Sequence, residues 1–237
     1  MPYFRKNKMK KLVYIFLTFA MTANAFGQKS NFYVGIVGGP SKTFLNGFNY
    51  TEEPQKPILS FFYGLYLQNK ISNIFSIRTD IQFERKGALY SGTFYYSTNP
   101  YFFSIDTAHY TSYSHMDYIT IPILLSTTID KKIKYYLNTG FYAGYLMKQE
   151  SIYHATAYYP DTIRKNTDDY QMFDYGISAG IGISIPINNL ILVSFEIRNN
   201  WGLYDIMKDD RFTMKTNSLN LRMGFVYTFD NVQTEKE

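Results

Sequence analysis

The chain has 237 residues, 46% of them apolar, which is enough for one domain with a substantial buried surface. It contains no cysteine, which excludes disulfides, and beyond the N-terminus it has no run of about 20 apolar residues of the kind that crosses a membrane as a helix. The 24 tyrosines and 20 phenylalanines favour strands and sheet rims, and the formal net charge is +5.

The N-terminal segment has the three parts of a secretory signal peptide. A basic stretch precedes an apolar run at residues 12–21, and small residues follow at positions 23–25. We therefore predict that residues 1–28 are removed on export, with Met1 or Met9 as the start. Removing the five basic residues of this segment leaves 19 of the 24 Lys and Arg against 19 Asp and Glu. Because the mature chain is then close to neutral, we predict no nucleic-acid partner.

Residues 75–83 alternate apolar and polar side chains, residue by residue. Successive side chains of a strand point to opposite faces of a sheet, so this pattern predicts a strand with different surroundings on its two sides. The same period recurs along most of the chain. We predict eight strands, at residues 31–39, 58–68, 75–86, 116–128, 133–147, 172–185, 190–201 and 218–229.

The predicted connections between these strands alternate in length. Outer-membrane barrels show this alternation, with tight periplasmic turns and longer external loops. We therefore predict an all-β fold at residues 29–229, an eight-stranded antiparallel up-and-down transmembrane β-barrel in the cell outer membrane, followed by a polar tail at residues 230–237. The short connections are residues 69–74, 130–132 and 186–189, and the long ones are residues 40–57, 87–115, 148–171 and 202–217.

The polar phase of the strands suits a narrow lumen, because it mixes small residues with isolated charges. Five glycines of two neighbouring strands would leave space there: Gly140, Gly144, Gly176, Gly180 and Gly182. We expect a structural ion-pair network to fill that space, formed by Arg78, Asp80, Glu84, Glu196, Arg198 and Arg222. An eight-stranded barrel has room only for its own interior side chains, so no open pore is expected. A soluble, lipocalin-like periplasmic carrier shows the same alternation, but its polar side chains face outward and its apolar side chains face inward. It remains an alternative.

The last predicted strand resembles the C-terminal assembly signal of outer-membrane barrels. Arg222, Gly224, Tyr227 and Phe229 stand at the positions that this signal specifies. The chain also resembles the PorT-like small outer-membrane β-barrel family, at residues 31–39, 64–87, 118–122 and 138–145. This resemblance covers nearly the whole mature chain. It implies an exported barrel with outer-membrane lipid and the barrel-assembly machinery as partners, and it permits an accessory role in type IX secretion.

Catalysis would most plausibly use the three histidines, which fall in or beside the predicted long loops. A base and a nucleophile could be assembled from neighbours in the sequence, which would give a rim-active hydrolase of lipid A or peptides. The residues lack a distinctive spacing, so we predict no enzymatic activity, no metal site and no cofactor. The candidates are His109, His115 and His154, with Asp106, Ser112, Ser114 and Asp117 nearby.

The predicted loop at residues 87–115 is rich in aromatic side chains, which supply large contact areas at low entropic cost. These side chains could equally extend the hairpin above the membrane or form the interfacial girdle. Our leading functional prediction is a non-catalytic surface or envelope-assembly role, with an unknown partner bound at the external loops. The candidate recognition residues are Tyr95, Tyr96, Tyr101, Phe102 and Phe103.

Overall fold

The computed structural model describes residues 32–47, 55–99, 104–129, 133–155 and 161–229. The predicted export signal and the predicted C-terminal tail lie outside these residues. Within them, no helix is both long and apolar enough to cross a membrane. The elements are β1 (Phe32–Gly47), β2 (Lys56–Lys70), β3 (Phe75–Asn99), β4 (Ser104–Ile129), β5 (Lys134–Ala155), β6 (Thr162–Lys165), the short 3-10 helix η2 (Thr167–Asp169), β7 (Phe173–Pro186), β8 (Ile191–Gly202) and β9 (Met214–Thr228).

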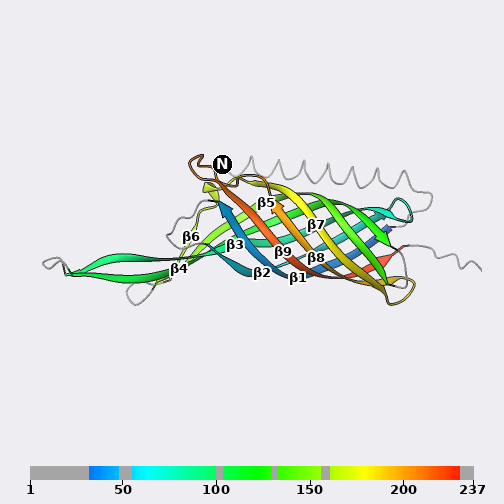
Figure 1. Cartoon of the computed structure of the whole chain (residues 1–237), viewed down its shortest axis with the longest axis horizontal. Helices are drawn as coiled ribbons and strands as arrows, with labels where there is room; N and C mark the ends of the chain where they lie inside the picture. The colour runs from blue at the N-terminus through cyan, green and yellow to red at the C-terminus, as the bar shows by residue number, and fades with distance from the viewer. Residues whose placement is uncertain (1–31, 48–54, 100–103, 130–132, 156–160, 230–237) are drawn as a thin grey trace, which may run out of the picture.

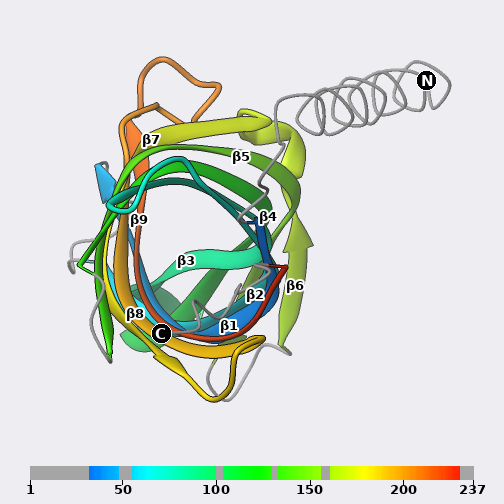
Figure 2. The same cartoon turned by 90° about the vertical axis from the view of Figure 1, so that its right-hand side faces the viewer.

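Eight of these strands form a closed antiparallel ring (Figures 1 and 2). Each strand pairs with its neighbour in sequence, except that β5 pairs with β7, and β9 closes the ring on β1 from Tyr33↔Thr228 to Gly47↔Met214. The short β6 pairs with the end of β5 and adds an edge strand outside the ring. The predicted eight-stranded antiparallel barrel is confirmed. Closure leaves no open edge in the ring, which is what a β-sheet inside a bilayer requires.

Three of the predicted long loops contain long stretches of strand, which corrects the sequence prediction. β1 runs on to Gly47, within the predicted loop at residues 40–57. β3 continues to Asn99 and β4 begins at Ser104, so most of residues 87–115 form a hairpin that projects beyond the barrel (Figure 1). β5 likewise runs on to Ala155, within the predicted loop at residues 148–171. The physical reason is that these segments are rich in Tyr, Phe, Thr and Ser, a composition that fits a strand as readily as an exposed loop.

The barrel wall and the projecting sheet meet at Gly87. A Cβ atom at this position would lie 1.9 Å from the backbone oxygen of Ser114 on the neighbouring strand. Only glycine therefore permits the close approach of β3 and β4 at this point. This contact keeps the two strands paired as they leave the barrel.

Apolar side chains cover the outside of the ring and charged side chains occupy the inside. Ile77 and Phe225 are 50% and 51% exposed, whereas the alternating Arg78 and Arg222 are 2% and 3% exposed. The predicted orientation of the two phases is thus confirmed. It contradicts the alternative of a soluble carrier, because such a carrier would turn its apolar phase toward an internal ligand.

Aromatic side chains gather near both ends of this apolar outer surface. At the end with the short turns, the rings of Tyr227 and Phe229 lie 4.9 Å apart. At the other end, Tyr175 contacts both Phe173 and Tyr204, with ring centroids 6.1 and 5.3 Å away. Two aromatic girdles flanking an apolar band are typical of a barrel that spans a bilayer.

An arginine on the outer surface should destabilise the folded barrel in lipid. Leu221 is 51% exposed near the middle of β9, so Leu221→Arg would place a charge in hydrocarbon. We expect a loss of about 2–4 kcal/mol in the free energy of unfolding, measured by urea titration in phospholipid vesicles. Leu203→Arg is the control, because Leu203 is equally exposed (54%) but follows β8 in an external loop. Equal losses in both variants would contradict the assigned orientation.

Candidate functional site

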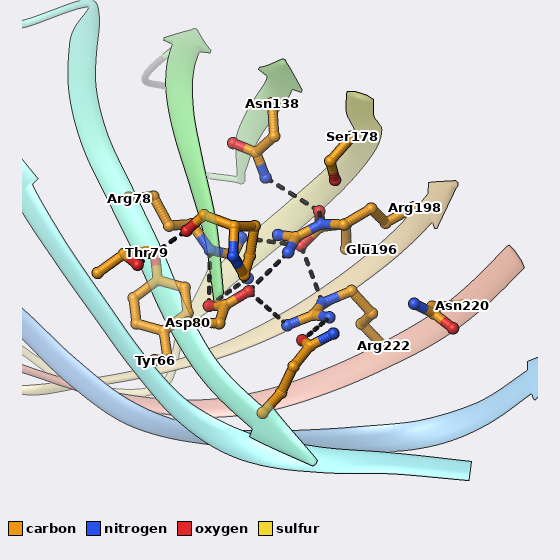
Figure 3. Close-up of polar contacts among 12 residues, drawn as sticks. Tyr66, Arg78, Thr79, Asp80, Asn138, Ser178, Glu196, Arg198, Asn220 and Arg222 are labelled. Atoms are coloured by element: carbon orange, nitrogen blue, oxygen red, sulfur yellow. Dashed lines mark hydrogen bonds and ion pairs between the residues drawn. The ribbon is translucent and has the colours of Figure 1, made fainter. Parts of the chain in front are cut away.

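Five charged side chains meet inside the barrel (Figure 3). Arg78 Nη1 lies 2.8 Å from Glu196 Oε2, and Arg198 Nη1 lies 2.6 Å from Asp80 Oδ2. Arg222 Nη2 binds the same Asp80 oxygen at 2.7 Å, while Arg198 Nε lies 2.7 Å from Glu196 Oε1. Each carboxylate is therefore shared between guanidinium groups, in short, charge-assisted hydrogen bonds.

The pairs Arg78–Glu196 and Arg198–Asp80 cross the lumen, because β3 and β8 are not neighbours in the ring. Glycines on β7 provide the room. Gly180 lies opposite Arg198 and Gly182 lies opposite Glu196 in the sheet register. A Cβ atom on Gly180 would lie 2.7 Å from Glu196 Oε1, and one on Gly182 would lie 2.5 Å from the ring of Tyr136. Small residues on β7 thus make space for the long charged side chains of the neighbouring β8.

Glu84 is held in the layer beyond this central cluster, toward the outer end. Its Oε1 atom accepts hydrogen bonds from Ser218 Oγ at 2.6 Å, Asn220 Nδ2 at 3.0 Å and Asn200 Nδ2 at 3.3 Å. Gln82 Nε2 donates to the other carboxylate oxygen at 3.4 Å. Neutral donors from three strands therefore surround a buried carboxylate, which offsets the cost of removing it from water.

A third layer contains two charged residues that the sequence did not single out. Lys86 Nζ lies 2.9 Å from Asp174 Oδ2 and donates to Thr216 Oγ1 at 3.1 Å. The ring of Tyr142 lies 4.5 Å from the same ammonium group. Both charged residues stand at polar positions of the alternating pattern in predicted strands, so their inward orientation could be predicted from the sequence. Their pairing across the barrel could not.

The lumen charges of the three layers balance. All eight groups are at most 5% exposed, and the positive and negative groups are equal in number. This balance matters because an unpaired charge in such a place would cost several kcal/mol. The structure thus places all six of the predicted network residues inside the barrel and adds two more. The cations are Arg78, Lys86, Arg198 and Arg222, and the anions are Asp80, Glu84, Asp174 and Glu196.

An apolar cluster covers the outer end of the lumen. It joins inward side chains of the projecting strands to residues 203–213, the connection between β8 and β9. Backbone hydrogen bonds of 2.8 Å fix this connection, from Gln171 N to Ile206 O and from Ile206 N to Met214 O. The polar interior is therefore closed by side chains on this side. The buried members are Leu45, Ala88, Tyr90, Met116, Tyr118, Leu146, Ile206, Met207 and Met214.

The residues proposed for a hydrolase do not come together. His115 stacks on Tyr113 on the outer face of the projecting sheet, and His154 meets the edge of the same ring. Ser112 and Ser114 belong to the opposite phase of β4 and are 6% and 4% exposed on the inner face. A histidine and a serine on opposite faces of one strand cannot act as base and nucleophile.

The remaining polar candidates are engaged with other partners. Asp117 accepts two hydrogen bonds from Arg85, at 2.7 and 3.0 Å. His109 Nδ1 lies 2.9 Å from Thr93 Oγ1, and His154 Nδ1 lies 2.9 Å from Asp161 Oδ2. The side chain of Asp106 lies outside the described part of the structure. Among the described residues, no three metal-ligating side chains cluster.

A groove of about 530 Å³ runs along the outer face of the projecting sheet, next to β2. We call it the external groove. Most of its lining is aliphatic, and two of the histidines stand at its edge. It is lined by Pro57, Ile58, Leu59, Leu89, Tyr113, His115, Ile152 and His154.

The other predicted site residues divide between described and undescribed parts. Tyr95 and Tyr96 lie on β3 in the projecting hairpin, whereas residues 101–103 lie outside the described residues, so the positions of Tyr101, Phe102 and Phe103 stay untested. In the predicted assembly signal, Arg222 and Gly224 face the lumen, and Tyr227 and Phe229 are exposed on the outside. The role of these four in assembly stays a prediction.

The family description "Outer membrane protein beta-barrel domain" matches residues 23–208, more than three quarters of the chain. The chain belongs to this family. Together with the apolar outer surface, this membership places the protein in the outer membrane. No curated protein matches the chain.

Solved structures of other outer-membrane barrels are similar in outline. Neisserial surface protein A is 13% identical with a TM-score of 0.45, and the alignment covers 86% of this chain and 100% of that one. A major outer membrane protein from Thermus thermophilus is 10% identical with a TM-score of 0.45, covering 84% and 99%. The outer membrane protease OmpT from Escherichia coli is 11% identical with a TM-score of 0.37, covering 85% and 98%. No activity or partner is transferred from them.

Neutralising one central carboxylate should destabilise the barrel strongly. Asp80→Asn would leave three guanidinium groups around one remaining carboxylate, and removing one partner of a buried ion pair costs about 3–5 kcal/mol. Asp209→Asn is the control: hydrogen bonds from Arg211 lower the pKa of this external carboxyl to about 2, but the pair is exposed and its removal should change stability little.

The measurement is the urea midpoint in detergent micelles. A second change, Arg198→Gln in the Asp80→Asn background, should recover part of the loss, because it removes one of the uncompensated cations. If Asp80→Asn lowers the urea midpoint no more than Asp209→Asn does, the claim that the network stabilises the barrel is refuted.

Proposed function

We propose that this protein is a non-conducting outer-membrane barrel that holds a β-sheet outside the membrane and binds a partner through that sheet, without catalysis. The observation that carries the proposal is the unequal length of the strands. A bilayer crossing needs about 9–11 residues of a tilted strand. β8 has 12 residues, whereas β3, β4 and β5 have 25, 26 and 22. The additional residues of these three adjacent strands are therefore not needed to cross the membrane.

The base of the projecting sheet is braced, which supports its use as a binding surface. Gln149 lies on its inner face and donates to Ser114 Oγ at 3.3 Å and Ser151 Oγ at 3.0 Å. Its side-chain oxygen accepts from the backbone N–H of Asn166, and its own backbone N–H donates to Thr167 Oγ1. The segment after β6 is thereby fixed against the sheet. A pre-ordered surface loses little entropy on binding.

The external groove supports a recognition role over a catalytic one. Leu59, at its margin, is 80% exposed, and the aliphatic lining offers contact area. Neither Ser112 nor Ser114 shares the face of the histidines at its edge, so the predicted rim hydrolase is not assembled among the described residues. We propose that the partner is a protein of the cell envelope, that the chain is a PorT-like member of its family, and that an accessory role in type IX secretion is the form to test first.

The lumen contents support the absence of conduction. Three layers of paired charges and an apolar cap fill the ring, so purified protein in planar lipid bilayers should give no stepwise conductance. A variant that lacks residues 206–211 should also stay silent, because the charged layers remain. Stable conductance steps from the folded wild-type protein would contradict the proposal.

Removing the hairpin tip should abolish partner binding and leave the barrel intact. Thr93 and His109 are paired in register, so an Asn-Gly turn can join them and replace residues 94–108 with a tight hairpin. A photo-crosslinking amino acid at Leu89, in the external groove, should capture an envelope protein in the wild-type background and lose it in the shortened one.

The matched control carries the crosslinker at Leu125, which is 47% exposed on the lipid side of β4. Capture of the same protein from Leu125, or unchanged capture after the tip is removed, would count against the sheet as the binding surface. Normal heat-modifiable migration on gels shows that each variant is folded.

A further inference from the structure

We infer that the inner end of the barrel, where the short turns lie, binds an oxyanion, either a phosphate or a carboxylate group. A cavity of about 40 Å³ lies inside the ring at this end, which faces the viewer in Figure 2. Every ring strand except β9 contributes a side chain to its wall. The lining consists of Tyr33, Tyr66, Gln68, Lys70, Asn73, Ser76, Ser126, Thr128, Lys134, Tyr136, Ser184 and Leu192.

The lining is rich in hydrogen-bond donors and contains no carboxylate. Lys70 and Lys134 bring two ammonium groups, which can only donate. Ser76 and Ser126 add hydroxyl groups that are 3% and 1% exposed. Amides and further hydroxyls complete the set, while the hydroxyls of Tyr66 and Tyr136 donate to other protein groups. Positive charge together with many donors selects an anion over a cation or an apolar ligand.

The volume fits a small polar group. A buried water needs about 10–15 Å³ of such space, so the cavity has room for about three waters, roughly the size of a carboxylate or phosphate group. A nucleotide, a sugar or an acyl chain is too large. The site therefore suits the charged end of a larger molecule, or a free ion.

The interior behind the cavity adds charge of the same sign. The nearest layer is the central cluster, which has three guanidinium groups and two carboxylates. Its Arg78 lies 4.3 Å over the ring of Tyr66, which lines the cavity. Glu84, which balances the remaining positive charge of this cluster, lies in the next layer outward. The inner mouth therefore has a positive potential that attracts anions.

Two sources could supply the oxyanion. One is the phosphate of a phospholipid headgroup in the inner leaflet. The other is the acidic tail of this chain, residues 230–237, which contains Asp230, Glu235 and Glu237. β9 ends at Thr228, which is paired with the cavity residue Tyr33.

The test is a phosphate titration of the ¹⁵N-labelled full-length protein in an uncharged maltoside detergent, beside a version that ends at Phe229. We expect saturable shifts of the Ser76 and Ser126 amide signals. If they occur only in the shortened version, the tail is the natural occupant. If both versions respond, and phosphatidylglycerol in nanodiscs blocks the response, the headgroup is the occupant.

Replacing Lys70 and Lys134 together by Gln should weaken phosphate binding at least tenfold in the version that binds it, and replacing both by Arg should preserve it. The control, Lys56→Gln with Lys208→Gln, changes two lysines at the outer end and should leave the affinity unchanged. No saturable shift in either length, or equal affinity after the Gln substitutions, overturns the inference. Heat-modifiable migration reports the folding of each variant.

Discussion

The ion pairs that join opposite walls of the barrel are the interaction on which the rest of the structure depends. Arg78 on β3 meets Glu196 on β8, and Arg198 on β8 meets Asp80 on β3. The cost of burying these charges is offset only while the shared network of partners, including those across the lumen, is present. The strands must therefore close into a ring of this size and register. The glycine positions of β7 cannot accept larger residues.

The filled lumen gives the two ends of the molecule different tasks. At the outer end an apolar cluster covers the polar layers, and β3, β4 and β5 continue into a sheet with its own groove. At the inner end a small cavity rich in donors remains. Because we propose that the filled barrel conducts nothing along its axis, we assign the recognition chemistry to the surfaces at its ends.

The sequence predicted what depends on local alternation and missed what depends on distant contacts. The period of two fixed the inward orientation of Arg78 and the outward orientation of Phe225, because neighbouring side chains on a strand point apart. It could not show that Lys86 meets Asp174, 88 residues away, because register around the ring decides that. The projecting hairpin was taken for a loop because Tyr, Thr and Ser suit both an exposed strand and a binding loop.

Exchange of arginine side-chain protons with solvent tests the filled lumen most directly, because it reports the burial of each guanidinium group separately. In ¹⁵N spectra of the folded protein, the Nε–H protons of Arg78 and Arg198 should exchange many times more slowly than that of Arg211, whose side chain is 79% exposed. Equal exchange rates for all three would show that water reaches the barrel interior freely, and would contradict the account.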